Sequence, residues 1–150
     1  MPRTQAFKIT GLILLVALAA ACQRTAGPSP TPVGPSTFAL TFSLTANPNV
    51  ILTGTARPTS TIEAAVTENG EPAFNRTVYF TIADGPGEFP NFSQRAAVTT
   101  DWNGVASIAY TGPTKFEIDS DTSATVMAQL ETSSPQIIAK TVVITILFSE

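Results

Sequence analysis

The side chains that could carry out catalysis are few in this chain. Histidine is absent and the only cysteine is Cys22, so the usual nucleophilic triads cannot be assembled. Transition-metal sites also lack their commonest ligands. The carboxylates fall mainly at expected turns or at outward strand positions, as Glu63 does, where a solvated role is typical. This inventory predicts that the protein is not an enzyme and holds no metal or cofactor.

One acidic cluster, at residues 117–121, has the composition of a calcium site. Its alternate carboxylates could point the same way, and calcium takes several oxygen ligands. The EF-hand pattern is incomplete, because Thr122 stands where the sharp-turn glycine belongs and Ala128 where the bidentate glutamate belongs. A solvated loop is the favoured interpretation, and calcium binding stays open as the alternative.

The single cysteine follows a short apolar run that has the layout of an export signal. Arg3 and Lys8 precede an apolar stretch from Ile9 to Ala21, which is the order of regions in a signal peptide. The run is shorter than the ~20 apolar residues that cross a bilayer as a helix. We therefore predict export and no permanent transmembrane anchor.

This segment resembles the bacterial lipoprotein signal, in which small and aliphatic residues precede an invariant cysteine. Residues 18–21, Leu-Ala-Ala-Ala, lead into Cys22, although the family usually has leucine where Ala19 stands. The resemblance implies that residues 1–21 are removed and that Cys22 carries a diacylglycerol and further acylation, palmitate included. Gln23 is not the aspartate that retains such proteins at the inner membrane in Gram-negative bacteria, so the resemblance favours the outer membrane.

An ordinary secretory cleavage site is the alternative, because residues 19–21 also fit a small-x-small pattern. Simple secretion would leave Cys22 as a free thiol without a disulfide partner. Lipidation accounts for that cysteine, and each buried methylene of an acyl chain contributes about 0.8 kcal/mol to membrane binding. We predict Cys22 as the lipidation site and the membrane as its partner.

Composition limits the other partners. The chain has 8 Lys and Arg against 11 Asp and Glu, for a formal charge of -3, and loss of Arg3 and Lys8 with the signal makes the balance more acidic. Binding to nucleic acid needs clustered basic residues, which the sequence lacks. We predict no nucleic-acid partner and an unidentified protein partner.

A linker is expected between the signal and the folded part. Residues 23–36 contain four prolines and two glycines, and proline favours extended polyproline geometry. At about 3 Å per residue such a tether reaches some ~40 Å. The predicted organisation is a removed signal at 1–21, a lipidated cysteine and linker at 22–37, and a domain at 38–150.

The rest of the chain alternates apolar and polar residues with the period of β-strands. Asn103 and Gly104 predict a hairpin turn between two of these segments. No helix is expected outside the signal, and seven or eight short strands predict an all-β, antiparallel sandwich. The expected strands cover residues 38–44, 50–52, 61–67, 78–82, 95–100, 106–110, 124–130 and 137–148.

Residues 46–146 resemble the bacterial immunoglobulin-like domain of the first type, which is repeated in invasin and intimin adhesins. The matching pieces are Ala46-Asn47-Pro48, the run STIEAAVTENGEPAFNRTVYFTI, the segment TTDWNGVASIAY, and SATVMAQL followed by KTVVITI. The resemblance implies an immunoglobulin-like fold. Trp102 departs from the family's usual small or charged residue at the turn.

Trp102 is the candidate for partner binding, because a large ring at a turn is costly to leave in water. Phe89 and Phe92 extend this surface if they lie at the same end of the sandwich. The alternative is that Trp102 folds back over the sandwich edge and the two phenylalanines plug its end.

The predicted function is a lipid-anchored bacterial envelope protein that presents one immunoglobulin-like domain as a non-catalytic binding or structural module. The adhesin resemblance suggests cell adhesion. The alternative is a periplasmic accessory or scaffold subunit of an envelope complex, whose edge strands pair with a partner.

Overall fold

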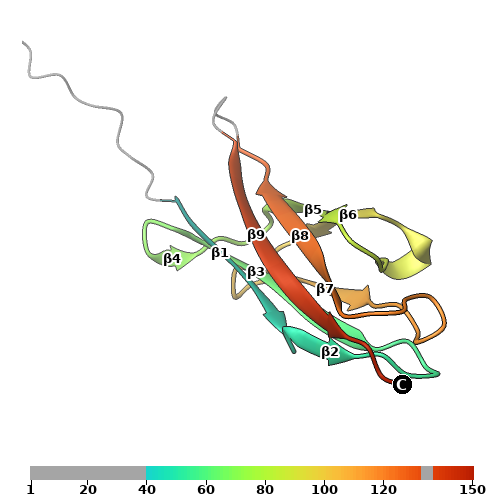
Figure 1. Ribbon diagram of the computed structural model, residues 1–150. Coiled ribbons are helices and arrows are strands. Elements are labelled where there is room, and N and C mark those ends of the chain that lie inside the picture. The colour runs from blue at the N-terminus through green and yellow to red at the C-terminus, as the bar shows by residue number, and fades with distance from the viewer. Residues whose placement is uncertain (1–39, 133–136) are drawn as a thin grey trace, which may run out of the picture. The chain divides into compact units, whose positions relative to one another are not determined.

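Alternating inward and outward side chains build two facing β-sheets (Figure 1). The computed structural model describes residues 40–132 and 137–150, so the predicted signal, Cys22 and the predicted linker lie outside the described residues. The first sheet contains β1 (Leu40–Asn47), β3 (Thr59–Glu68), β4 (Glu71–Pro72) and β7 (Val105–Thr111). The second contains β2 (Val50–Leu52), β5 (Thr77–Asp84), β6 (Arg95–Thr99), β8 (Thr122–Leu130) and β9 (Ile138–Leu147).

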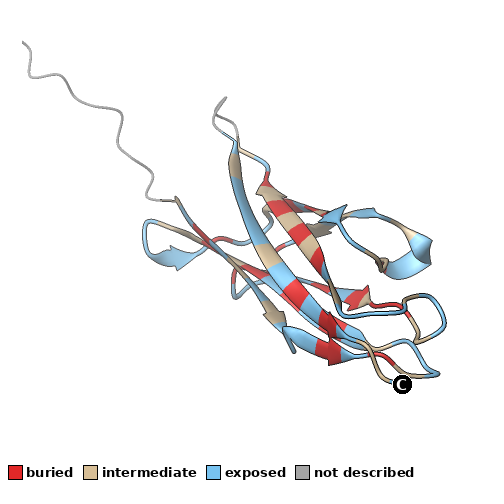
Figure 2. Ribbon diagram, in the orientation of Figure 1, coloured by how far each residue is buried: buried red, intermediate tan, exposed pale blue. Residues whose placement is uncertain are grey.

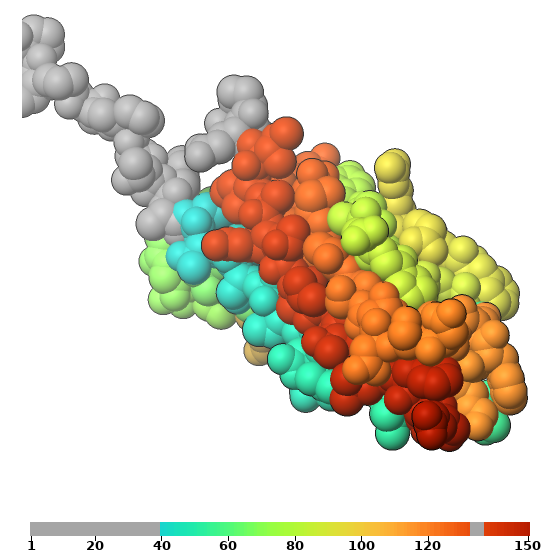
Figure 3. Space-filling view, viewed as in Figure 1, coloured from blue at the N-terminus to red at the C-terminus, as the bar shows by residue number. Residues whose placement is uncertain are grey.

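Strand pairing is antiparallel except at one edge. In the first sheet β3 pairs with β1 on one side and with β7 and the short β4 on the other. The second sheet has the order β2-β9-β8-β5-β6, and β2 is parallel to β9. The chain therefore passes from the first sheet to the second between β1 and β2. In the space-filling view β8 and β9 run side by side across the front, with β1 and β2 along one side (Figure 3).

The predicted all-β sandwich is confirmed, and the described residues form nine strands where seven or eight were expected. Two details of the pairing also differ from expectation. Residues 68–72 lie between two of the expected strands, but Asn69 and Gly70, both at positive φ, close a short hairpin there that pairs β3 with β4. The predicted hairpin across Asn103 and Gly104 is wrong. That turn joins β6 to β7, and β6 pairs with β5 in one sheet whereas β7 pairs with β3 in the other.

The core lies between the sheets and consists of every second residue of the long strands (Figure 2). Tyr110, Phe80 and Phe89 are the largest of its fully buried side chains. Burial of this apolar area stabilises the fold by roughly 25 cal/mol per Å². The inward residues include Ile62, Ala64, Val66, Val78, Phe80, Ala106, Tyr110, Ala124, Val126, Ala128, Ile144 and Ile146.

The two ends of the sandwich differ, and we name them by their loops. At the β4 end, Leu40 pairs with Glu68 beside the β3–β4 turn. The Val66 N–H donates a hydrogen bond to the Gly104 carbonyl of the β6–β7 turn, which lies at the same end. At the loop end lie the connections 53–58, 85–94 and 112–121 (Figure 1). No helix in the described ranges is long and apolar enough to cross a membrane.

Thr100 organises the β4 end from within. Its hydroxyl is buried, donates to the Ala73 carbonyl at 2.6 Å and accepts the Arg76 N–H at 2.9 Å. Its backbone N–H donates to the Arg76 carbonyl, and its carbonyl accepts the Asn75 N–H. One side chain thereby ties the segment before β5 to the end of β6.

Tyr110 has the same role toward the loop end. Its buried hydroxyl donates to the Pro86 carbonyl, and Gly87 lies so close to the ring that an added Cβ would be 2.3 Å from the hydroxyl oxygen. The positive φ of Gly87 also favours glycine there. Burial raises the pKa of Tyr110 to about 12.

Replacing Thr100 with valine keeps the side-chain shape and removes both hydroxyl hydrogen bonds. We expect Thr100→Val to lower the free energy of unfolding by about 1–3 kcal/mol, because the buried Ala73 carbonyl and the partly buried Arg76 N–H lose their partner. Urea unfolding followed by circular dichroism checks this. Thr99→Val, at the neighbouring exposed position, is the control and should change stability by no more than about 0.5 kcal/mol.

Stability should fall in strong alkali through Tyr110. Since its pKa is raised from 10.0 to about 12 in the folded state, the unfolded chain releases the proton first, and stability decreases as pH rises from 10 to 12. Thermal unfolding measured across that range should show a steeper decline for the wild type than for Tyr110→Phe. Equal declines would show that another group dominates the alkaline transition.

Candidate functional site

The three aromatic residues proposed for partner binding do not form one surface. Trp102 and Phe92 are 78% and 85% exposed, whereas Phe89 is 1% exposed. Phe89 packs edge-to-face on Phe80, with ring centroids 6.4 Å apart, so its assignment to a binding surface is wrong. Its backbone pairs with Ser93 across the loop and turns the ring inward.

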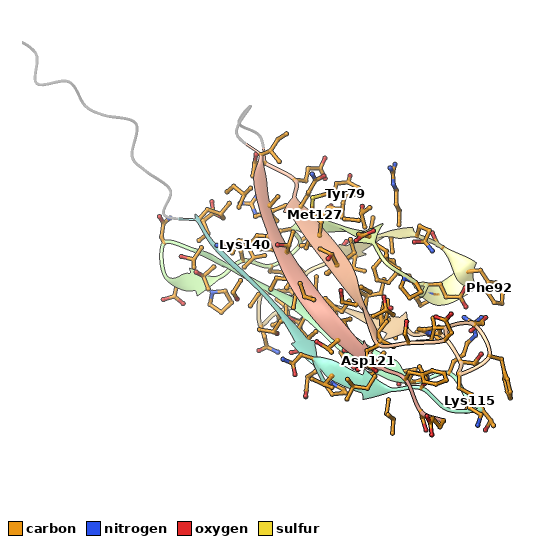
Figure 4. The ribbon with its side chains drawn as sticks, in the orientation of Figure 1. Tyr79, Phe92, Lys115, Asp121, Met127 and Lys140 are labelled. Carbon is orange, nitrogen blue, oxygen red and sulfur yellow. The ribbon has the colours of Figure 1, made fainter. Side chains whose placement is uncertain are left out.

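Trp102 and Phe92 lie at opposite ends of the sandwich. Trp102 follows β6 at the β4 end, and Phe92 precedes β6 in the loop-end connection 85–94, as Figure 4 shows for Phe92. The length of β6 therefore separates the two rings. The condition for a shared aromatic surface, that these residues lie at the same end of the sandwich, is therefore not met.

The turn that carries Trp102 is fixed by Asp101. The Asp101 carboxylate accepts the Val105 N–H at 3.0 Å and the Asn103 N–H at 2.8 Å. The hydrogen bond from the Val105 N–H is the main cause of the lowered pKa of Asp101, and the bond from Asn103 adds to it. Desolvation raises the pKa, but by less than the Val105 bond lowers it. Gly104 completes the turn at positive φ, and an added Cβ there would be 2.4 Å from the Val66 carbonyl oxygen.

The Trp102 indole lies flat on Phe74. The ring centroids are 3.7 Å apart and the planes differ by 2°. Trp102 thus folds back onto the protein with one face, as the alternative sequence interpretation expected, yet most of the ring stays in solvent. Phe74 was missed because it lies between β4 and β5, outside any alternating segment.

A polar pocket opens at the same end of the sandwich. It has a volume of about 240 Å³ and is lined by Asn75, Arg76, Thr77, Glu131 and Thr132. Asn75 follows Phe74 directly, and both Asn75 and Arg76 bond to Thr100, two residues before Trp102. An ion pair with Glu68 holds the Arg76 guanidinium. The pocket combines amide, guanidinium, hydroxyl and carboxylate groups.

At the loop end, an arginine bridges all three connections. Arg57 pairs with Glu88 at 3.0 Å and with Glu117 at 2.5 Å. Glu117 also accepts the Thr114 N–H, which is the main cause of its lowered pKa, with Arg57 contributing less. This bridge was missed because its members are 31 and 60 residues apart.

The carboxylates of the acidic segment 117–121 point to different partners. Glu117 binds Thr114 and Arg57, Asp119 contacts the Ser120 hydroxyl, and Asp121 accepts the Phe148 N–H at 2.8 Å. Among the described residues no three acidic side chains are grouped as metal ligands. The segment serves as structural caps and ties at the loop end.

An open groove lies on the outer face of the second sheet. It has a volume of about 540 Å³ and crosses β5, β6 and β8, where Figure 4 shows Tyr79 and Met127 together. Its lining is mainly apolar or uncharged, with Arg95 as the charged member. The groove lacks the convergent polar groups that mark a specific small-molecule site.

Comparison with known proteins shows the fold. The major subunit AggA of aggregative adherence fimbriae type I from Escherichia coli superposes with a TM-score of 0.52 at 10% identity, covering 73% of this chain and 95% of AggA. The D00-D0 domain of intimin gives 0.49 at 19% identity, covering 72% of this chain and 46% of that structure, so the chain spans less than half of it. No family model and no curated protein sequence matches.

Phe92 sits on a strained backbone. Asn91 and Phe92 both have positive φ, 64° and 57°, a conformation that costs an L-residue about 1–2 kcal/mol. Because the ring is exposed, we expect Phe92→Gly to leave stability unchanged or to raise it by up to about 1 kcal/mol, measured by urea unfolding. Phe116→Gly is the matched control: Phe116 is 77% exposed without positive φ, and its replacement should destabilise by about 0.5–1 kcal/mol. A clear loss with Phe92→Gly would show that its ring packs on the protein.

Proposed function

We propose that this protein is a lipid-anchored component of the bacterial envelope and that its immunoglobulin-like domain is a non-catalytic binding or structural module. The main observation that supports a binding role is the exposure of Trp102. A hydrogen-bonded turn holds this large ring, and most of its surface lies in solvent. Exposed aromatic rings of this kind supply contact area at binding surfaces at small entropic cost.

The side chains capable of chemistry support a non-catalytic role. The carboxylates at the loop end are engaged in ion pairs and backbone caps, and the Tyr110 hydroxyl is buried on the Pro86 carbonyl. These groups stabilise the fold and its loops. The exposed aromatic residues are the features left for a partner.

The proposed anchor is Cys22, with the outer membrane as its site. The apolar run before Cys22 and the proline-rich segment after it suit a signal and a tether. The described domain begins at the β4 end, where Leu40 opens β1. A tether joined there connects to the end that carries Trp102.

Two roles fit such a module. The resemblance to invasin and intimin domains favours cell adhesion, and AggA is likewise the major subunit of an adherence fimbria. A periplasmic scaffold or accessory subunit is the second candidate, because β1, β7, β2 and β6 are sheet edges that a partner strand can extend. Protease treatment of intact cells separates them, since digestion requires surface exposure.

Loss of the anchor thiol should release the protein. We expect Cys22→Ser to move most of the protein from the membrane fraction to the soluble fraction, because no acyl chain can be attached. Fractionation with immunoblotting and labelling with a palmitate analogue measure this. Trp102→Ala should remain membrane-bound and labelled. Retention of Cys22→Ser in the membrane would overturn the anchor proposal.

A further inference from the structure

Trp102 is presented as a one-sided platform. Its inner face rests on the Phe74 ring, with nearly parallel planes and ring centroids 3.7 Å apart. The residue remains 78% exposed. Asp101 and Gly104 fix the turn beneath it. A ring held this way loses little conformational freedom when a ligand covers its outer face, which favours binding.

The surroundings of the platform restrict the ligand. The β4 end carries Glu68, Glu71, Asp101 and Glu131 against the paired Arg76. This acidic balance disfavours nucleotides, anionic lipids and other phosphate-bearing molecules, whose recognition relies on positive charge. A neutral ligand with a flat apolar face is compatible with both the ring and the charges.

The polar pocket at this end selects among neutral ligands. Asn75 and Arg76 provide donors, and Glu131 provides an acceptor, at the same end of the sandwich as the flat ring. A pyranose has an apolar C–H face that can stack on an indole and hydroxyl groups that can bond to such side chains. A proline-rich peptide would use the ring and leave these polar groups largely unused.

We propose that Trp102 and the polar pocket of Asn75, Arg76 and Glu131 form a saccharide-binding site. This inference rests on the proposed role of the domain as a binding module and names its ligand class. The outer indole face stacks on a neutral sugar ring. The pocket residues bind hydroxyl groups of the same or the adjoining sugar unit.

The chain offers a direct readout because Trp102 is its only tryptophan. The full-length protein, kept in a detergent without a sugar headgroup, is titrated with cellohexaose, chitohexaose and maltohexaose while indole fluorescence is recorded. We expect at least one of the three to shift or quench the emission saturably. Absence of any change with all three at millimolar concentration would overturn the proposal.

Variants then test the site by affinity electrophoresis in gels containing the polymer of the bound sugar. Trp102→Ala should weaken binding at least about tenfold, Trp102→Tyr should retain part of it, and Asn75→Asp should weaken it while tolerating the positive φ at this position. Phe92→Ala, at the opposite end, should bind as the wild type does. Thermal unfolding confirms that each variant is folded.

Two outcomes contradict the saccharide site specifically. One is equal affinity of folded Trp102→Ala and the wild type. The other is an emission change with a synthetic peptide of residues 24–36, used as a proline-rich probe, and with none of the sugars. If Cys22→Ser still leaves the membrane in either case, the anchored module stands and only its proposed ligand class is lost.

Discussion

The fold depends on burying every second side chain of the long strands between two sheets. With a single cysteine in the sequence, no internal disulfide is possible, so packing and hydrogen bonding hold the sheets together. Phe80 and Tyr110 fill the centre, and the hydrophobic effect drives their burial. The positions of Trp102, Phe92 and Phe116 follow from this core, because each connection must begin where a core strand ends.

Hydrogen bonds of two buried hydroxyls fix the loops relative to the packed core. Thr100 joins Ala73 and Arg76 to the end of β6, and Tyr110 bonds to Pro86 in the β5–β6 connection. A buried donor or acceptor without a partner is costly, so these bonds specify one arrangement of each loop. The Trp102 platform inherits its rigidity from Thr100 and from the Asp101 turn.

The two ends of the sandwich consequently have different characters. At the loop end, Arg57 ties together the connections that carry Glu88 and Glu117, and the acidic segment is used for caps. The β4 end carries a flat aromatic stack and a polar pocket. Recognition is therefore best supported at the end where β1 begins, and structural bracing at the other.

Period-two alternation in the sequence was sufficient to identify the strands and the sandwich, because the inward and outward faces of a strand are encoded locally. The turn signal placed Trp102 at a turn, and the structure decided that this residue is 78% exposed. Alternation could not assign strand partners: Asn103 and Gly104 signalled a tight turn, but whether β6 and β7 pair is decided by contacts with β5 and β3.

The same limit applies to the site. Phe89 and Phe92 lie three residues apart in one loop, yet one is buried and the other exposed, because backbone pairing with Ser93 turns Phe89 onto Phe80. Phe74 meets Trp102 directly by ring stacking, and Thr100 holds the segment around Phe74 through Arg76 and Ala73, 24 and 27 residues away in the sequence. The sequence by itself determined the fold class and the anchor hypothesis, whereas long-range pairing, which no local pattern encodes, decided which side chains meet.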